Sequence, residues 1–126
     1  MRAICGLSSG GICAFNVAWE RPDVFGKVVS HCGSFVNIRG GHLLASAVRA
    51  GPSKPLRVFL QSGAHDLDIV FGNWPHANRE LAAALTYQGC AHQLVIGAGG
   101  HSLAHGGAIF PDTLRWLWQD TMESSS

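Results

Sequence analysis

A serine flanked by glycines lies near the start of the chain and has the sequence context of a nucleophile. Residues 6–11, GLSSGG, follow a short apolar run and contain a G-x-S-x-G motif with one further glycine behind it. In the strand-to-helix turn of such motifs, small residues let the strand and the helix approach each other, and a strained backbone exposes the serine Oγ. The motif therefore predicts Ser8 as a nucleophile, although glycine and serine are common enough to make it weak when it stands alone.

A serine hydroxyl is a weak nucleophile near neutral pH, so it needs an imidazole as base and a carboxylate that orients the imidazole. His101 and Asp66 supply these two groups, with Asp68 as an alternative acid. The chain order of serine, aspartate and histidine is the order of α/β-hydrolases, and it differs from the orders in chymotrypsin and subtilisin. Two glycines before His101, at 99 and 100, favour a functional histidine, because they let the backbone bring its ring close to the serine turn.

Each of these residues also has an ordinary structural interpretation. Ser8 could be an ordinary turn residue and Asp66 a helix or turn cap. His101, which is one of seven histidines in the chain, could be an ordinary loop residue. Ser34 is a poor alternative nucleophile because it lacks the second flanking glycine. The remaining five histidines outside the 101–105 segment are expected to be exposed or to form structural hydrogen bonds: His31, His42, His65, His76 and His92.

Metal binding is the competing chemistry for a chain rich in histidine. His101 and His105 have the i, i+4 spacing of zinc-binding helices, but the glutamate of an H-E-x-x-H motif is absent. Gly106 and Gly107 argue against a stable helix at this point. We therefore expect no metal site and no cofactor.

The elements that would position these residues alternate between strand and helix. Apolar and β-branched runs predict strands over residues 2–5, 27–32, 56–61 and 92–96. Apolar spacing predicts helices over 11–19, 73–87 and 109–118, with a short helix at 42–48. This pattern predicts an α/β fold with a parallel sheet of about four strands, in which Ser8, Asp66 and His101 all follow strand ends.

Composition limits the classes of function. A chain of 126 residues forms one domain, and with 47% hydrophobic and 13% charged residues its sheet should be covered on both faces. A net charge of +1 favours a small-molecule partner over nucleic acid or a membrane surface, and the absence of a signal-peptide pattern favours the cytoplasm. The four cysteines, with Cys5 and Cys32 in apolar runs, are expected to be buried thiols, and residues 121–126 are expected to be a disordered tail.

Five stretches, residues 3–11, 56–66, 72–81, 99–111 and 114–118, carry a family resemblance in combination. Over them the chain resembles the C-terminal half of the esterase family related to enterochelin esterase, which includes esterase D-like proteins, feruloyl esterase domains and mycolyltransferases. The resemblance implies an α/β-hydrolase fold in which Ser8 is the nucleophile, His101 the base and Asp66 the acid. The Ser9 N–H is implied as an oxyanion donor, although the family more often has methionine there. Leu7 and Trp74 are expected at a substrate pocket, with a place in the hydrophobic core as an equal alternative for Trp74.

The resemblance also implies what would precede the serine turn. Such folds have several strands before it, together with the loop that gives the second oxyanion N–H. We therefore expect a partial α/β-hydrolase fold lacking its N-terminal strands, which self-associates or is complemented by the missing segment. The leading hypothesis is a serine hydrolase of carboxylic esters acting through an acyl-enzyme. The alternatives are a truncated fragment that is inactive or needs a partner, and an acyltransferase using the same triad.

Overall fold

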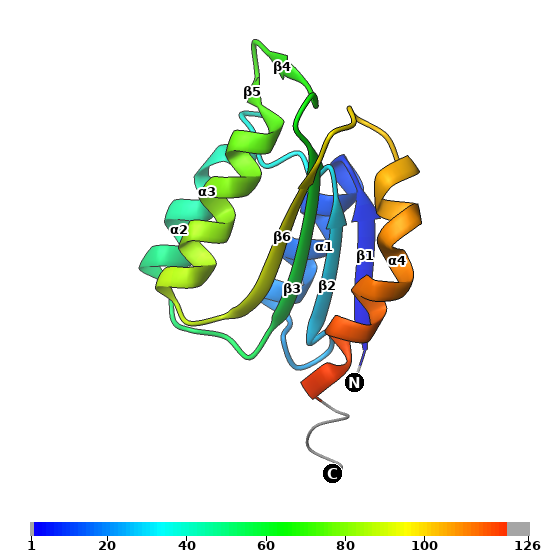
Figure 1. Ribbon diagram of the computed structural model, residues 1–126. Helices are drawn as coiled ribbons and strands as arrows, with labels where there is room; N and C mark the ends of the chain where they lie inside the picture. Colours follow the sequence, from blue (N-terminus) through cyan, green and yellow to red (C-terminus); the bar gives the residue numbers. More distant parts are fainter. Residues whose placement is uncertain (1, 121–126) are drawn as a thin grey trace.

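The computed structural model describes residues 2–120 and contains a parallel sheet with helices on both faces (Figure 1). The four strands lie side by side in chain order: β1 (Ala3–Leu7), β2 (Lys27–His31), β3 (Arg57–Gly63) and β6 (Ala91–Gly97). All three neighbouring pairs are parallel. The predicted α/β class and four-stranded sheet are confirmed, whereas the tail predicted over 121–126 lies outside the described residues.

Side chains alternate between the two faces of the sheet and build two hydrophobic clusters. Val28 and Val58 face the larger cluster, which contains residues of α1 (Ser9–Glu20), α2 (Leu44–Ala50) and α3 (Trp74–Tyr87). Their neighbours Val29 and Phe59 face the smaller cluster beneath α4 (Ala104–Leu117). Because both faces are covered, consecutive residues of the central strands β2 and β3 are buried, instead of every second one.

Short elements fill the connections between the main strands. The helix predicted over 42–48 is a 3₁₀ turn, η1 (Gly41–Leu43), followed directly by α2. A small antiparallel hairpin of β4 (Asp68–Ile69) and β5 (Gly72–Asn73) precedes α3 and was not predicted. In α3, Asn73 caps the first turn by accepting a hydrogen bond from the His76 N–H, and Pro75 lies in that turn.

Helix α4 contradicts the expectation that Gly106 and Gly107 prevent a helix at this point. It begins at Ala104, five residues before the predicted start, and includes both Gly106 and Gly107. Glycine weakens a helix interior by about 1 kcal/mol, but a Cβ on Gly106 would lie only 2.6 Å from the His31 ring. Close packing on His31 therefore explains the glycine at position 106, and the Gly-Gly pair does not exclude a helix.

Two further expectations about side-chain environment are wrong. Cys5 and Cys13 are exposed, because β1 is an edge strand and Cys13 lies on the outer side of α1; only Cys32 and Cys90 are buried. His31 is neither exposed nor hydrogen-bonded at Nε2 within the described part of the chain. Burial lowers its pKa, with a smaller contribution from His105.

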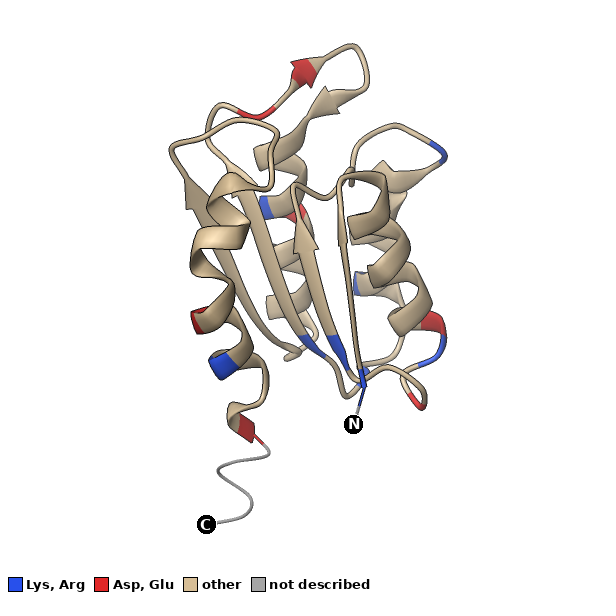
Figure 2. Cartoon of the chain, turned by 90° about the vertical axis from the view of Figure 1, so that its right-hand side faces the viewer, with Lys and Arg blue, Asp and Glu red and all other residues tan. Residues whose placement is uncertain are grey.

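Basic residues of the sheet lie where its strands begin, at the end away from the loops that follow the strands (Figure 2). Lys27 is buried, and its Nζ donates to the Leu117 carbonyl and pairs with Asp120. Arg57 donates to the Trp116 carbonyl and Lys54 to the Trp19 carbonyl. These contacts place cations at the C-terminal ends of α4 and α1, where positive charge is favourable.

No helix within residues 2–120 is long and apolar enough to cross a lipid bilayer.

Candidate active site

Ser8 forms the turn between β1 and α1 in a conformation that only a few non-glycine residues adopt. Its φ is 59° and its ψ is −118°, which confirms the predicted backbone strain. The Ser8 N–H donates to the His31 carbonyl at 2.8 Å. The Ser8 carbonyl accepts from the N–H groups of Gly11 and Ser34 at 2.9 and 3.1 Å. Neighbouring backbone therefore holds the strained serine in place.

The glycines around Ser8 do not contribute equally to the close approach of β1 and α1. A Cβ on Gly6 would lie 2.1 Å from the Gly10 carbonyl oxygen, and one on Gly11 would lie 2.4 Å from Ser30 Oγ. A Cβ on Gly10, the second glycine of the motif, would meet nothing within 4 Å. The close approach of strand and helix thus depends on Gly6 and on the additional glycine, Gly11.

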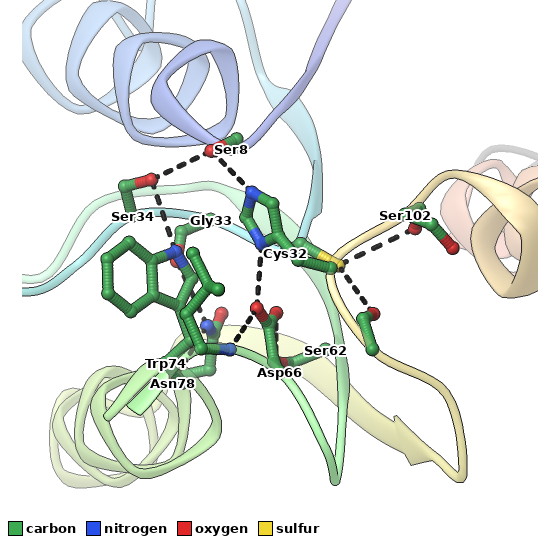
Figure 3. A network of polar contacts seen from close by, with 12 residues as sticks. Ser8, Cys32, Gly33, Ser34, Ser62, Asp66, Trp74, Asn78 and Ser102 are labelled. Atoms are coloured by element: carbon green, nitrogen blue, oxygen red, sulfur yellow. Dashed lines mark hydrogen bonds and ion pairs between the residues drawn. The ribbon is translucent and has the colours of Figure 1, made fainter. Parts of the chain in front are cut away.

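Three residues from three strand ends form one hydrogen-bonded chain (Figure 3). Ser8 follows β1, Asp66 follows β3 and His101 follows β6. His101 Nε2 lies 2.9 Å from Ser8 Oγ, and His101 Nδ1 lies 2.7 Å from Asp66 Oδ1. The structure therefore brings together all three residues that the sequence suggested for a triad.

Asp66, and not Asp68, contacts the histidine. The Asp66 carboxylate is buried and also accepts hydrogen bonds from Ser62 Oγ at 3.2 Å and from the Leu67 N–H at 2.6 Å. Because an ionised carboxylate can only accept, His101 Nδ1 carries the proton and Nε2 is left to accept from Ser8. Asp68 begins β4, is exposed and pairs with the hairpin strand.

The loops carrying Asp66 and His101 are held together by their backbones. The N–H groups of Ala64 and His65 donate to the carbonyls of Gly97 and Gly99. A Cβ on Gly63 would lie 2.0 Å from the Gly99 oxygen, whereas one on Gly99 would meet nothing within 4 Å. The glycine that lets these loops approach each other is therefore Gly63, which the sequence argument did not single out.

Ser34 is a site residue that the sequence analysis missed. Its Oγ lies 3.1 Å from Ser8 Oγ and 3.3 Å from Trp74 Nε1 (Figure 3). The Trp74 ring also lies edge-on to the His101 ring, with 5.9 Å between centroids. Ser34 was considered only as a nucleophile. Its place in the loop that follows β2, the strand next to β1, is the signal that could have indicated a role beside Ser8.

A cavity of about 630 Å³ opens beside Ser8. Its lining includes Ser9 at the start of α1, Ser34, Trp74 and Phe71, and among the described residues Arg39 is the one charged side chain that lines it. Trp74, which was expected at a substrate pocket, thus lines the cavity beside Ser8. Leu7 does not line this cavity, because it faces the α4 side of the sheet and lines a separate cavity of about 330 Å³.

One group of side chains could in principle hold a metal ion. One ligand atom each of Cys32, Asp66 and His101 lies within 4.8 Å of the others. However, burial, with a smaller contribution from Asp66, raises the pKa of the Cys32 thiol to about 11, so the thiolate that metals prefer is costly. Asp66 and His101 already bond each other, and His105 contacts Gln61 instead of joining His101. The donor set therefore fits a hydrogen-bond network better than a metal centre.

Comparison with known proteins finds one family model and several relatives that match the chain. A family model described as "Putative esterase" matches residues 1–117. The chain is 28% identical over 130 residues to an iron(III) enterobactin esterase of Dickeya dadantii (strain 3937), in an alignment that covers 90% of this chain and 28% of that protein.

Solved structures of hydrolases also match the chain. The enterobactin esterase from Shigella flexneri, crystallised in the presence of enterobactin, matches with a TM-score of 0.77 and 27% identity, over 94% of this chain and 31% of that one. An S-formylglutathione hydrolase from Agrobacterium tumefaciens shares the fold, with a TM-score of 0.70 at 18% identity, over 93% of this chain and 48% of that one. The chain thus spans less than a third of the length of both enterobactin esterases.

Proposed function

The chain belongs to the esterase family whose model matches residues 1–117, and from this premise we propose that it is a serine hydrolase of carboxylic esters. The observation that carries the proposal is the unbroken hydrogen-bonded chain from Ser8 through His101 to the buried Asp66. A serine Oγ within 2.9 Å of an imidazole nitrogen, with a carboxylate on the other nitrogen, is the arrangement that activates a hydroxyl for acyl transfer.

The proposed reaction begins when Ser8 Oγ attacks the ester carbonyl carbon. His101 Nε2 takes the hydroxyl proton, and the Asp66 carboxylate stabilises the imidazolium that forms. The Ser9 N–H, at the first position of α1, donates to the developing oxyanion. His101 then gives the proton to the leaving alcohol. In the second half, a water molecule attacks the acyl carbon while His101 takes one of its protons. The bond between Ser8 Oγ and the acyl carbon then breaks, and His101 returns the proton to Ser8 Oγ as the acid leaves.

The cavity beside Ser8 supports a small-molecule ester as the substrate. Its volume of about 630 Å³ is typical of small-ligand sites, and Ile12, Ile69 and Phe71 provide apolar walls. The relatives named enterobactin esterases support an ester substrate as well. We propose that the acyl or alcohol part of the ester occupies this cavity and that the reaction needs no cofactor, nucleic acid or membrane.

Labelling with a fluorophosphonate tests the proposal. The probe phosphonylates only an activated serine, so the wild-type chain should be labelled at Ser8, as located by mass spectrometry of the peptides. Ser8→Ala should lower both labelling and hydrolysis of 4-nitrophenyl acetate by at least about a thousandfold. Ser46→Ala, an exposed serine in α2, is the matched control and should be labelled like the wild type. A folded wild-type chain that is not labelled, or equal labelling of Ser8→Ala, would overturn the assignment.

A further inference from the structure

Ser34 makes a second polar contact to the proposed nucleophile, besides the one from His101, and Trp74 in turn contacts Ser34. Ser34 Oγ lies 3.1 Å from Ser8 Oγ, and Trp74 Nε1 lies 3.3 Å from Ser34 Oγ. Both residues are buried, with 3% of each exposed. These two contacts are not used in the proposed acyl transfer, so their effect on Ser8 is an independent question.

The chemistry of the groups fixes which atom donates in each contact. An indole N–H can only donate, so Ser34 Oγ accepts from Trp74. The Ser34 hydroxyl hydrogen then needs an acceptor, and Ser8 Oγ is the one within hydrogen-bond distance among the described residues. Leaving a buried hydroxyl donor without a partner is unfavourable, so the Ser34 O–H donates to Ser8 Oγ.

The contact between His101 and Asp66, at the other end of this series of hydrogen bonds, indicates the same direction of donation for the Ser8 hydroxyl. Asp66 only accepts, so His101 donates through Nδ1 and accepts through Nε2. Ser8 therefore donates its own proton to His101 while it accepts from Ser34. If Ser8 instead donated to Ser34, its proton would point away from the base and the hydroxyl would have to rotate before each attack.

The backbone around Ser34 and Trp74 is tied together by one side chain. Asn78 is fully buried in α3, and its Nδ2 donates to the Gly33 carbonyl at 3.1 Å and to the Trp74 carbonyl at 3.0 Å. The Trp74 N–H also donates to the Leu67 carbonyl. The distance between Ser34 and Trp74 is thus fixed by the fold.

We propose that Ser34 and Trp74 are positioning residues that set the direction of the Ser8 hydroxyl toward His101. The inference rests on the proposed function, because it assigns Ser8 as the nucleophile. It predicts that Trp74 acts through Ser34, so that removal of the indole N–H and removal of the Ser34 hydroxyl impair one and the same step.

A double-mutant cycle on the rate of fluorophosphonate labelling tests this. Ser34→Ala and Trp74→Phe should each slow labelling of Ser8 by about 5- to 30-fold, the scale of losing one positioning hydrogen bond. The double variant should be no slower than the slower single one, because the second substitution removes a link that is already broken. For Ser34→Ala, kcat for ester hydrolysis should fall while KM changes less than twofold. Ser34→Thr, which keeps a hydroxyl, should restore most of the rate.

Ser30→Ala is the matched control for loss of a buried hydroxyl. Ser30 lies on β2, is fully buried, and its Oγ has no hydrogen-bond partner within the described residues. It should change labelling less than twofold. Full-rate labelling of both Ser34→Ala and Trp74→Phe, or multiplicative effects in the double variant, would overturn the positioning role and leave the proposed function intact. Absence of Ser8 labelling in the wild type would overturn both. Unfolding by urea identifies any variant that loses rate only because it unfolds.

Discussion

Cys32 lies directly behind Asp66 and His101 with its backbone in the left-handed region, at a φ of 50°. Its thiol has no solvent exposure and faces the carbonyls of Gly100 and Ser102 in the loop that carries His101. Burial raises its pKa to about 11, so the thiol stays protonated at neutral pH and can donate weakly to these carbonyls. Cys32 is therefore expected to be an unreactive structural residue of the site.

This shift predicts a loss of stability at alkaline pH. The folded state binds the Cys32 proton more tightly than the unfolded state, whose thiol has a pKa of 9.0. The resulting stabilisation is complete below pH 9 and disappears as the pH rises through about 11. The free energy of unfolding should fall in this window by up to about 1.4 kcal/mol per pH unit.

Urea unfolding between pH 8 and 11 measures this dependence. Cys32→Ala should flatten the curve, whereas Cys13→Ala, an exposed cysteine, should leave it unchanged. Burial also raises the pKa of Cys90, so some alkaline slope should remain in Cys32→Ala. Identical slopes for Cys32→Ala and the wild type would contradict the assignment.

The residues proposed for the reaction were easier to find in the sequence than the residues that position them. Ser8, Asp66 and His101 could be identified because each follows an apolar strand and their order is informative. Residue type and spacing alone do not separate Asp66 from Asp68, because the difference depends on where the two-residue strand β4 begins; only the family resemblance favoured Asp66. Ser34 was missed because a motif describes a nucleophile and not the neighbour that orients it.

At the scale of elements, the junction of β1 and α1 gives a matched pair of glycine substitutions. Gly11→Ala would place a Cβ 2.4 Å from Ser30 Oγ and 3.0 Å from Gly33 Cα, so it should destabilise the protein by about 1–3 kcal/mol through overpacking. Gly10→Ala meets open space within α1, so it should stabilise by about 0.4–1 kcal/mol through the lower entropy of the unfolded chain.

The free energies of unfolding of both variants, measured in urea, check this pair. Equal effects of the two substitutions would show that the motif glycine and the additional glycine are equivalent, contrary to the packing described above.

Elements were predictable from sequence where local pattern and burial agree. The four strands are apolar runs that end near glycine or polar residues, and their order confirms the predicted α/β alternation. The β4–β5 hairpin was not predictable, because strands of two residues carry no periodicity. The early start of α4 was missed because the helix propensity of Gly106 is overridden by its contact with His31, which lies 75 residues away in the chain.

At the scale of the whole molecule, the sheet has β1 at one edge and β6 at the other. In the described residues β1 pairs with β2 alone, and Cys5 at its centre is exposed. Unpaired strand edges present N–H and C=O groups to other chains. Exposed apolar side chains, including Val70 with 90% of its surface accessible, add to the tendency to associate.

We propose that the isolated chain self-associates through the β1 edge. Light scattering after size-exclusion chromatography, in the presence of a reductant, should show a mass that rises with protein concentration. Cys5→Lys places a charge on the edge strand and should increase the monomer fraction severalfold, whereas Cys13→Lys on α1 should not. A monodisperse monomer at all concentrations would contradict this prediction.

The contact between Lys54 and the end of α1 has a consequence at the opposite end of that helix. An α-helix behaves as a dipole with about half a positive charge at its N-terminus and half a negative charge at its C-terminus. Lys54 donates to the Trp19 carbonyl and lies over the Trp19 ring, so the negative end of α1 is neutralised. No carboxylate lies in the first turn, so the positive end at Ser9 keeps its full field beside Ser8. Lys54 thus offsets the negative end of α1 and leaves the positive end beside Ser8, whose dipole has the sign that an oxyanion requires.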